Sequence, residues 1–294
     1  MKTIYQTLFI SIVLLLCSIN GHAVPYRFDN MHIDGTSTIC SFTQDESGMM
    51  WLGTENGLYS YDGYNFYPHF DRRDITNSRV HSLCMRDGMI YLGTENGLMI
   101  YDIHAGKYVE KAKNGPRDIR AMLMMNDRML IGTSRGLYVK KGNSIRYAAE
   151  YGISQTVYSM LNTHWGQLIG TINGLYVING NHARRIMIGT GRQPLVNAII
   201  ADKHNNIWVG TEGALYSWNG RNFIPVLPLM GNSVKTLTFD AHNNLLAGTD
   251  NGLYVISPNG MVLRIIHDAR SQESLVNNIV WSLFRDRFNN IWIG

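Results

Sequence analysis

Short runs of apolar, aromatic and β-branched residues alternate along the chain with turns rich in Gly, Asn and Asp. The first clear example spans residues 36–70 and contains four runs: TICSF at 38–42, MMWLGT at 49–54, GLYSYD at 57–62 and NFYPHF at 65–70. Residues of these types favour β-strands, and Gly, Asn and Asp favour the turns between them. No window after residue 23 has the length and the 3.6-residue period of a helix. The pattern therefore predicts short strands joined by tight turns.

The same pattern returns every 38–40 residues. Each copy contains a hexapeptide that begins with Gly-Thr, such as GTENGL. The leading glycines are Gly53, Gly93, Gly132, Gly170, Gly210 and Gly248, and Gly294 comes after the letters IWI in a further partial copy. Four strands in about 40 residues make one blade of a β-propeller. We therefore predict an all-β fold, a β-propeller with six complete four-stranded blades and a partial seventh, and a seven-bladed ring in the intact protein.

The Gly-rich hexapeptide could be a phosphate-binding loop or a turn. A phosphate loop needs a following helix and usually a Lys, and neither is present. Asn-Gly is the preferred centre of a type I′ hairpin, and Gly in the first central place suits type II′. We therefore predict hairpins centred on Asn56-Gly57, Asn96-Gly97, Asn173-Gly174 and Asn251-Gly252, and a type II′ turn at Gly213-Ala214.

The first 23 residues differ from the repeats. Lys2 precedes an apolar run from Leu8 to Leu16, and Gly21-His22-Ala23 supplies the small residues of a cleavage site. The segment 1–23 is interpreted as a cleaved signal peptide, so the chain is expected to be exported. Lipid attachment at Cys17 is the less favoured alternative, because lipoprotein signals usually carry a small residue before the cysteine.

Residues 24–294 are then expected to form the propeller, truncated in its last blade. The segment 25–30, PYRFDN, resembles a fourth strand that lacks the first three of its blade. Propellers commonly close by lending a strand from one terminus to the blade at the other, which removes exposed sheet edges. We therefore expect the two ends of the chain to meet in one blade, and we interpret the sequence as a fragment of a longer protein.

The composition limits the kinds of binding site that the chain can contain. Export leaves only Cys40 and Cys84, which are predicted to be buried free thiols rather than a disulfide framework. The net charge of +4 is small and scattered, so no nucleic-acid contact is expected. Asp202, Asp240 and Asp286 each open a turn, where an aspartate can accept backbone N–H bonds. A calcium site would need more oxygen ligands than these turns offer.

Motifs for catalysis or metal binding are missing from the sequence. There is no HExxH, no Cys-His cluster at ligand spacing and no GxSxG elbow. His164, His204 and His242 fall in corresponding turns and are expected to be exposed. Carboxylates can still meet in space to hydrolyse a glycan, and Glu55, Glu95, Glu212 and Asp250 are expected to share one face of the ring. We nevertheless predict no catalytic residue, no metal and no cofactor in this chain.

An alignment of the first strand of every blade gives the candidate binding site. The strand starts with Ile39 or its equivalents, and the residue two places later is always small, as at Ser41. The position between them is chemically mixed, unlike a packing column. Its candidate ligand-binding members are His81, Arg120, Tyr158, Asn197, Lys235 and Trp281. Aromatic surfaces and charged donors at the mouth of a central channel would suit a sugar, including an acidic one. The alternative is that these side chains only fill gaps between blades.

The pattern DxxxNxIWVGTxxGLY at 202–216, together with aromatic and Asp-Gly residues after it as in Tyr61-Asp62-Gly63, resembles the two-component regulator propeller repeat. The resemblance covers 24–294. It implies the N-terminal propeller of a hybrid two-component sensor of Bacteroidetes, on the periplasmic side of the inner membrane. The expected ligand is an oligosaccharide, and the expected partners are a second propeller and downstream domains, including a histidine kinase. The full-length sensor could form a homodimer.

Two other classes of function stay open beside a ligand sensor. One is a propeller lyase or hydrolase that acts on glycans, and the other is an interaction scaffold of the cell envelope. No catalytic residue of the family can be placed on this chain, so it is expected not to be an enzyme by itself.

Overall fold

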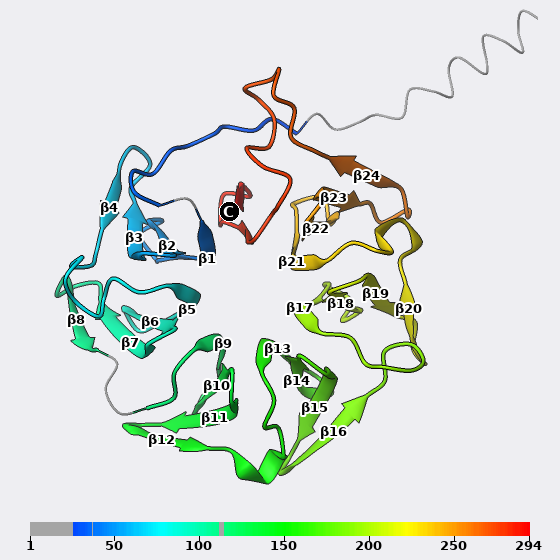
Figure 1. The fold of residues 1–294 in the computed structure, drawn as a ribbon, viewed down its shortest axis with the longest axis horizontal. Helices are drawn as coiled ribbons and strands as arrows, with labels where there is room; N and C mark the ends of the chain where they lie inside the picture. Colours follow the sequence, from blue (N-terminus) through cyan, green and yellow to red (C-terminus); the bar gives the residue numbers. More distant parts are fainter. Residues whose placement is uncertain (1–25, 37, 112–114) are drawn as a thin grey trace, which may run out of the picture.

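The computed structural model describes residues 26–36, 38–111 and 115–294. The predicted signal peptide, 1–23, lies outside the described residues. Six sheets have four antiparallel strands each, and one sheet has two. This arrangement confirms the all-β fold with six complete blades and almost no helix (Figure 1). The seven-bladed ring of an intact protein and the domain limits 24–294 stay predictions.

The strands follow the repeat in sequence order. The first three blades contain β1 (Ile39–Gln44), β2 (Met50–Thr54), β3 (Gly57–Tyr61), β4 (Phe66–Pro68), β5 (Val80–Arg86), β6 (Met89–Thr94), β7 (Gly97–Asp102), β8 (Lys107–Glu110), β9 (Ile119–Met124), β10 (Met129–Thr133), β11 (Gly136–Lys141) and β12 (Ser144–Tyr147). The next three contain β13 (Val157–Thr163), β14 (Gly166–Thr171), β15 (Gly174–Asn179), β16 (His182–Ile186), β17 (Val196–Ala201), β18 (Ile207–Thr211), β19 (Leu215–Trp218), β20 (Phe223–Pro225), β21 (Val234–Phe239), β22 (Leu245–Thr249), β23 (Gly252–Ile256) and β24 (Val262–Ile265). The two-stranded sheet has β25 (Leu283–Arg285) and β26 (Ile291–Ile293), and two 3₁₀ turns are η1 (Ala149–Tyr151) and η2 (Leu227–Leu229).

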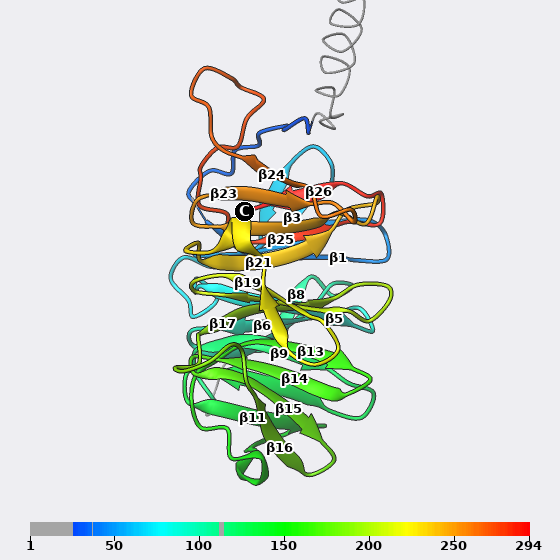
Figure 2. The same ribbon diagram turned by 90° about the vertical axis from the view of Figure 1, so that its right-hand side faces the viewer.

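The first strand of each blade lies innermost, as Figure 1 shows for β1, β5, β9, β13, β17 and β21. Neighbouring inner strands contact one another around the ring, and β25 contacts both β21 and β1. The two-stranded sheet therefore occupies a seventh sector between the sixth blade and the first. Figure 2 gives the edge-on view of this ring, with the loop after β24 standing away from it. None of the helical turns in the described ranges is long and apolar enough to span a membrane.

The repeated glycines are explained by close packing between blades. A Cβ on Gly53 would lie 2.7 Å from Val80 Cγ1, and one on Gly132 would lie 2.5 Å from Val157 Cγ1. Real Cβ contacts are much longer, so only glycine lets the first strand of the next blade approach. Gly294 repeats the relation, because its Cβ would lie 2.8 Å from Ile39 Cβ. The seventh sector thus meets the first blade as the other blades meet their neighbours.

The hairpins between the second and third strands differ from the prediction by one residue. Thr54 pairs with Gly57, so Glu55 and Asn56 are the central residues rather than Asn-Gly. None of the four Asn residues has a positive φ, and neither does Gly213, so types I′ and II′ were wrong. The Gly after each Asn does have a positive φ, for example 131° at Gly57. Glycine is needed there because a left-handed backbone is costly for other residues.

A buried threonine holds each of these hairpins. Its hydroxyl donates to the carbonyl oxygen three residues on, at 2.7–3.0 Å, and accepts the N–H two residues on. The six threonines are Thr54, Thr94, Thr133, Thr171, Thr211 and Thr249, each at most 1% exposed. The repeated letters Gly-Thr therefore have two structural roles, close approach and turn closure, and no role in phosphate binding is needed.

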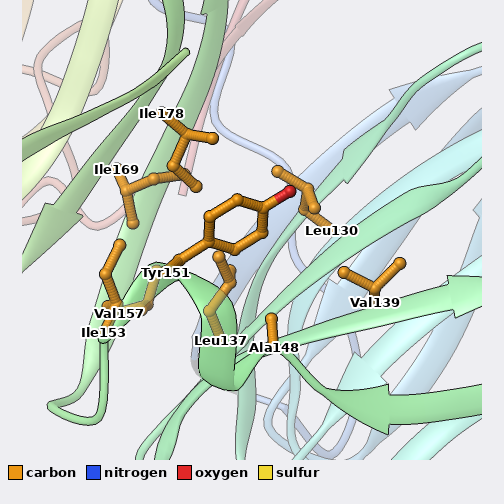
Figure 3. Close-up of a cluster of buried hydrophobic side chains, with 9 residues drawn as sticks. All are labelled: Leu130, Leu137, Val139, Ala148, Tyr151, Ile153, Val157, Ile169 and Ile178. Carbon is orange, nitrogen blue, oxygen red and sulfur yellow. The ribbon is translucent and has the colours of Figure 1, made fainter. Parts of the chain in front are cut away.

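Apolar side chains between neighbouring blades form the core. Figure 3 shows the cluster between the third and fourth blades, in which Tyr151 of η1 projects among aliphatic side chains. The cluster comprises Leu130, Leu137, Val139, Ala148, Tyr151, Ile153, Val157, Ile169 and Ile178. Similar clusters lie between the other blades. Because each blade buries its faces against two neighbours, the ring as a whole supplies the core.

The aspartates that open the turns after the first strand act as predicted for structural turns. Asp202 Oδ1 accepts the backbone N–H groups of His204 and Asn206 at 2.8 and 2.9 Å. Asp240 and Asp286 repeat this arrangement. In the first blade Asp45 does the same and also accepts the indole N–H of Trp51 at 2.9 Å. Burial disfavours the ionised form of Asp45, but these hydrogen bonds outweigh it and keep its pKa below the usual value.

The N-terminal segment is not the expected fourth strand. Residues 26–30 are extended but pair with no strand. A fourth strand pairs with a third, and β26 has no described neighbour on its outer side. The segment is instead held by side chains: Tyr26 packs on the sixth and seventh sheets and donates to Asp240 Oδ2 at 3.2 Å. Asn30 Nδ2 donates to the carbonyl oxygen of Gln272 at 2.8 Å.

Cys40 and Cys84 are free thiols that are partly rather than fully buried. Burial raises the pKa of Cys84 to about 12. Burial is also the main cause that raises the pKa of Cys40. Both thiols are therefore protonated and unreactive at neutral pH.

Acid is expected to destabilise the contact between the first two blades through His69. Its ring lies between Ser60 Oγ, 2.8 Å from Nε2, and the Tyr101 hydroxyl, 2.9 Å from Nδ1. Burial lowers the pKa of His69 from 6.5 to about 4. The unfolded chain therefore binds the proton first, so stability is complete above pH 6.5 and is lost as the pH falls towards 4. At about 1.4 kcal/mol per pKa unit, reduced for solvent screening of a partly exposed ring, the loss is about 2 kcal/mol.

Urea unfolding at pH 7, 5.5 and 4.5 measures this loss. The His69→Gln variant serves as the comparison, since Gln keeps a polar side chain but cannot titrate. The interpretation predicts a shallower pH dependence for the variant; equal slopes for both proteins would contradict it.

Candidate functional site

The six predicted site residues occupy equivalent structural positions. In every complete blade the register between the inner strand and the second strand shifts at the second residue of the inner strand. In the second blade, for example, Val80 pairs with Thr94 and Ser82 pairs with Gly93, so His81 between them has no pairing partner. This is a β-bulge, in which one extra residue is left unpaired and its side chain is re-aimed. Trp281 completes the series, because its N–H and that of Ser282 both donate to Gly294 O, at 2.7 and 3.3 Å.

We call these bulge residues the inner ring. Its members are Cys40, His81, Arg120, Tyr158, Asn197, Lys235 and Trp281. Trp281 is 50% exposed, and the others are half-buried. The residue before each inner strand accepts an N–H from the hairpin between the second and third strands, as Arg79 O does from Glu95 at 3.2 Å. The inner ring thus lies at the end of the inner strands next to these hairpins.

Two pairs of neighbouring inner-ring residues are in contact. The Arg120 guanidinium lies 5.1 Å from the centre of the Tyr158 ring, and Lys235 Nζ lies 4.5 Å from that of Trp281. Both are cation–π contacts between adjacent blades. Asn197 Nδ2 donates to Val234 O of the next blade at 3.1 Å. The structure therefore places the predicted residues at equivalent positions around one ring, with two pairs of them in contact.

Asp118 contacts two inner-ring residues and was not found by the alignment of the inner strands. Its Oδ2 accepts from Arg120 Nε and a terminal Arg120 nitrogen, at 3.2 and 3.0 Å, and its Oδ1 lies 3.4 Å from His81 Nε2. Asp118 has a φ of 50°, which is uncommon for a residue other than glycine and is often found near functional sites. Its position, two before the bulge, is as chemically variable as the bulge itself: Thr38, Arg79, Asp118, Thr156, Leu195 and Ser233. Extending the alignment by two residues would have found it.

Burial lowers the pKa of His81, and the nearby Arg120 lowers it further, while Asp118 opposes both. The imidazole is therefore neutral at neutral pH. The Asp118 carboxylate therefore forms its ion pair with Arg120, and the negative charge of the one balances the positive charge of the other.

A groove of about 610 Å³ lies elsewhere, at the outer rim of the first blade. It is bounded by the N-terminal segment, Met31 to Asp34, and by aromatic side chains of β3 and β4, including Tyr59 and Phe66. None of the inner-ring residues lines this groove, so we do not assign it as the ligand site.

The His, Glu and Asp residues singled out in the sequence lie at separate turns in the described part of the chain. No group of three or more His, Cys, Asp or Glu side chains there could hold a metal ion. His164, His204 and His242 are exposed, as expected. Glu95, Glu212 and Asp250 are exposed residues of separate hairpins.

The comparisons with known proteins agree with this fold. The profile of a family described as "Two component regulator propeller" matches residues 190–213 and 274–294. Two solved structures of the extracellular domain of BT4673 from B. thetaiotaomicron are similar over 92% of this chain, with identities of 33% and 32% and TM-scores of 0.86 and 0.85. BT4673 is named as a one-component system in one and as a hybrid two-component system in the other. The chain spans only 39% and 38% of those structures.

A third structure supports the fold alone. It is the extracellular domain of the hybrid two-component system BT3049 from B. thetaiotaomicron, with 22% identity, a TM-score of 0.74, and coverage of 92% of this chain and 40% of its own. The curated proteins include no match. The repeat, the six four-stranded blades and the similarity to the BT4673 domain lead to one conclusion: the chain is a propeller domain of the two-component regulator propeller family.

Proposed function

We propose that this propeller is the ligand-sensing part of an exported hybrid two-component sensor and binds an oligosaccharide derived from a glycan. The sensor would lie on the periplasmic face of the inner membrane. The signal would pass through a second propeller and further domains to a histidine kinase of the same protein, which could act as a homodimer. The similarity to extracellular domains of two-component systems supports the sensor role.

The inner ring is the observation that carries the proposal. Six blades and the two-stranded sheet present a chemically mixed series of side chains at one bulge position, where packing alone would favour uniform ones. Aromatic rings and hydrogen-bonding groups in one place suit a sugar, which needs a stacking surface and polar contacts. A lyase or hydrolase would need two cooperating carboxylates, and the exposed hairpin residues come from separate blades.

Removing two inner-ring side chains should weaken binding. The Arg120→Ala/Trp281→Ala double variant deletes a guanidinium and the most exposed aromatic ring of the series. We expect at least a tenfold loss of affinity for an oligosaccharide that binds the unchanged protein, which is about 1.4 kcal/mol. Isothermal titration calorimetry on the chain from residue 24 measures it.

The matched control is Arg221→Ala/Phe288→Ala, which removes an Arg and a 68% exposed aromatic residue from turns at the opposite ends of the strands. This control should keep the full affinity. An inner-ring variant whose affinity stays within about 0.5 kcal/mol, the range of ordinary surface substitutions, would show that the ligand binds elsewhere.

A further inference from the structure

The positive charges of the inner ring are not equivalent. Arg120 is paired with Asp118 through two hydrogen bonds and also covers the Tyr158 ring. A ligand anion would have to compete with Asp118 for this guanidinium. Arg120 is therefore poorly suited to bind an acidic group, although it can still hold a neutral polar one.

Lys235 differs from Arg120 in this respect. No ion pair joins Lys235 to a carboxylate within the ranges 26–36, 38–111 and 115–294. Its Nζ lies 4.5 Å from the centre of the Trp281 ring, and the indole is 50% exposed. The side chain is half-buried, so its position is limited by its neighbours. An unmatched ammonium is thus held beside an aromatic surface that solvent can reach.

We propose that Lys235 and Trp281 form a subsite for an anionic pyranose, a sugar that carries a carboxylate or a sulfate. This inference rests on the proposed function, because it assigns one sugar of the same ligand. The indole packs against the C–H groups of the sugar ring, and the ammonium donates charge-assisted hydrogen bonds to the anion. Asn197, on the neighbouring blade, already uses its amide N–H to reach Val234 O. Of Asn197, Lys235 and Trp281, Lys235 is therefore the residue that can bind a negatively charged group.

Ligand charge should decide affinity if the assignment is correct. The probes are oligogalacturonides, the same oligosaccharides after reduction of their carboxyl groups, and sulfated chondroitin oligosaccharides. We expect an anionic probe to bind at least tenfold more tightly than the carboxyl-reduced one, and the difference to shrink as salt is raised. Chondroitin oligosaccharides carry both anions, so a loss of their affinity on desulfation identifies sulfate as the anion, and a loss on carboxyl reduction identifies the carboxylate.

Two Lys variants locate the effect. Lys235→Met keeps the apolar stem and removes the charge, so it should lose about tenfold or more in affinity for the anionic probe and change little with the neutral one. Lys203→Met, at an exposed turn near the other ends of the strands, is the control and should bind like the unchanged chain.

The outcomes separate the two proposals. If neutral probes bind as well as anionic ones, or if Lys235→Met retains its affinity, the anionic subsite is wrong; a loss in the Arg120→Ala/Trp281→Ala variant would then still support an inner-ring sugar site. If none of these oligosaccharides binds, both the proposed function and the subsite are overturned.

Discussion

Replacing Gly132 by Ala is expected to lower the free energy of unfolding by about 3 kcal/mol, the upper range for overpacking a well-packed core. The new Cβ would lie 2.5 Å from Val157 Cγ1 and 2.9 Å from Val157 Cβ, and Val157 is fully buried. The backbone of Gly132 is not in the left-handed region, so the loss would be steric rather than conformational. Chemical denaturation followed by tryptophan fluorescence measures it.

Gly213→Ala is the matched control for this effect. A Cβ at Gly213 meets nothing within 4 Å, and its φ suits any residue. Its stability should change by no more than about 0.5 kcal/mol. The double variant Gly132→Ala/Val157→Ala should cost less than the sum of its single changes, because it removes the clash. Strict additivity would show that the contact between the two blades is not the cause.

The Asp45→Ala variant should lose about 3 kcal/mol of unfolding free energy. It removes the acceptor of three N–H groups, those of Ser47, Met49 and the Trp51 indole. Asp45 is only 7% exposed and Trp51 3%, so water replaces these bonds poorly. A buried donor without a partner costs about 1 kcal/mol or more. Thermal and urea unfolding, together with the near-ultraviolet signal of Trp51, would report the change.

Asp62→Ala provides the comparison for Asp45. Asp62 accepts the N–H groups of Tyr64 and Asn65 in a similar way, but it is exposed and water can take its place. Its removal should cost clearly less. Equal losses in the two variants would mean that burial of the turn aspartate is not what makes it stabilising.

Local patterns predicted the strands of this protein well, because each strand carries its own sequence signal. The run MMWLGT at 49–54 becomes β2, and GLYSYD at 57–62 becomes β3. The hairpin between them was wrong by one residue because Asn-Gly is a strong local signal for a turn centre. The hydroxyl of Thr54 decided the outcome instead, by closing the turn around Glu55 and Asn56.

The site was predictable to the extent that it follows the repeat. Alignment of the inner strands was enough to find the position of Lys235 and Trp281, because every blade places it in the same way. It could not give the pairing of Asp118 with Arg120, which depends on a single left-handed residue. Nor could it give the contact of Asp118 with His81, which depends on the approach of two blades. It also could not show which cation has no carboxylate beside it, since that is a property of the folded ring.

The contact between each repeated glycine and the first residue of the next inner strand also bears on how such a chain can gain or lose blades. Every blade contacts two neighbours in this way: it supplies the glycine at the contact with the next blade and the β-branched residue at the contact with the preceding blade. Recombination between equivalent points of two repeats therefore inserts or deletes one complete unit and leaves every junction with a matched pair. A crossover between points that are out of phase would place a larger residue opposite Val or Ile and prevent the blades from packing. The repeat thus makes blade number easy to change by whole units and resistant to change by any other length.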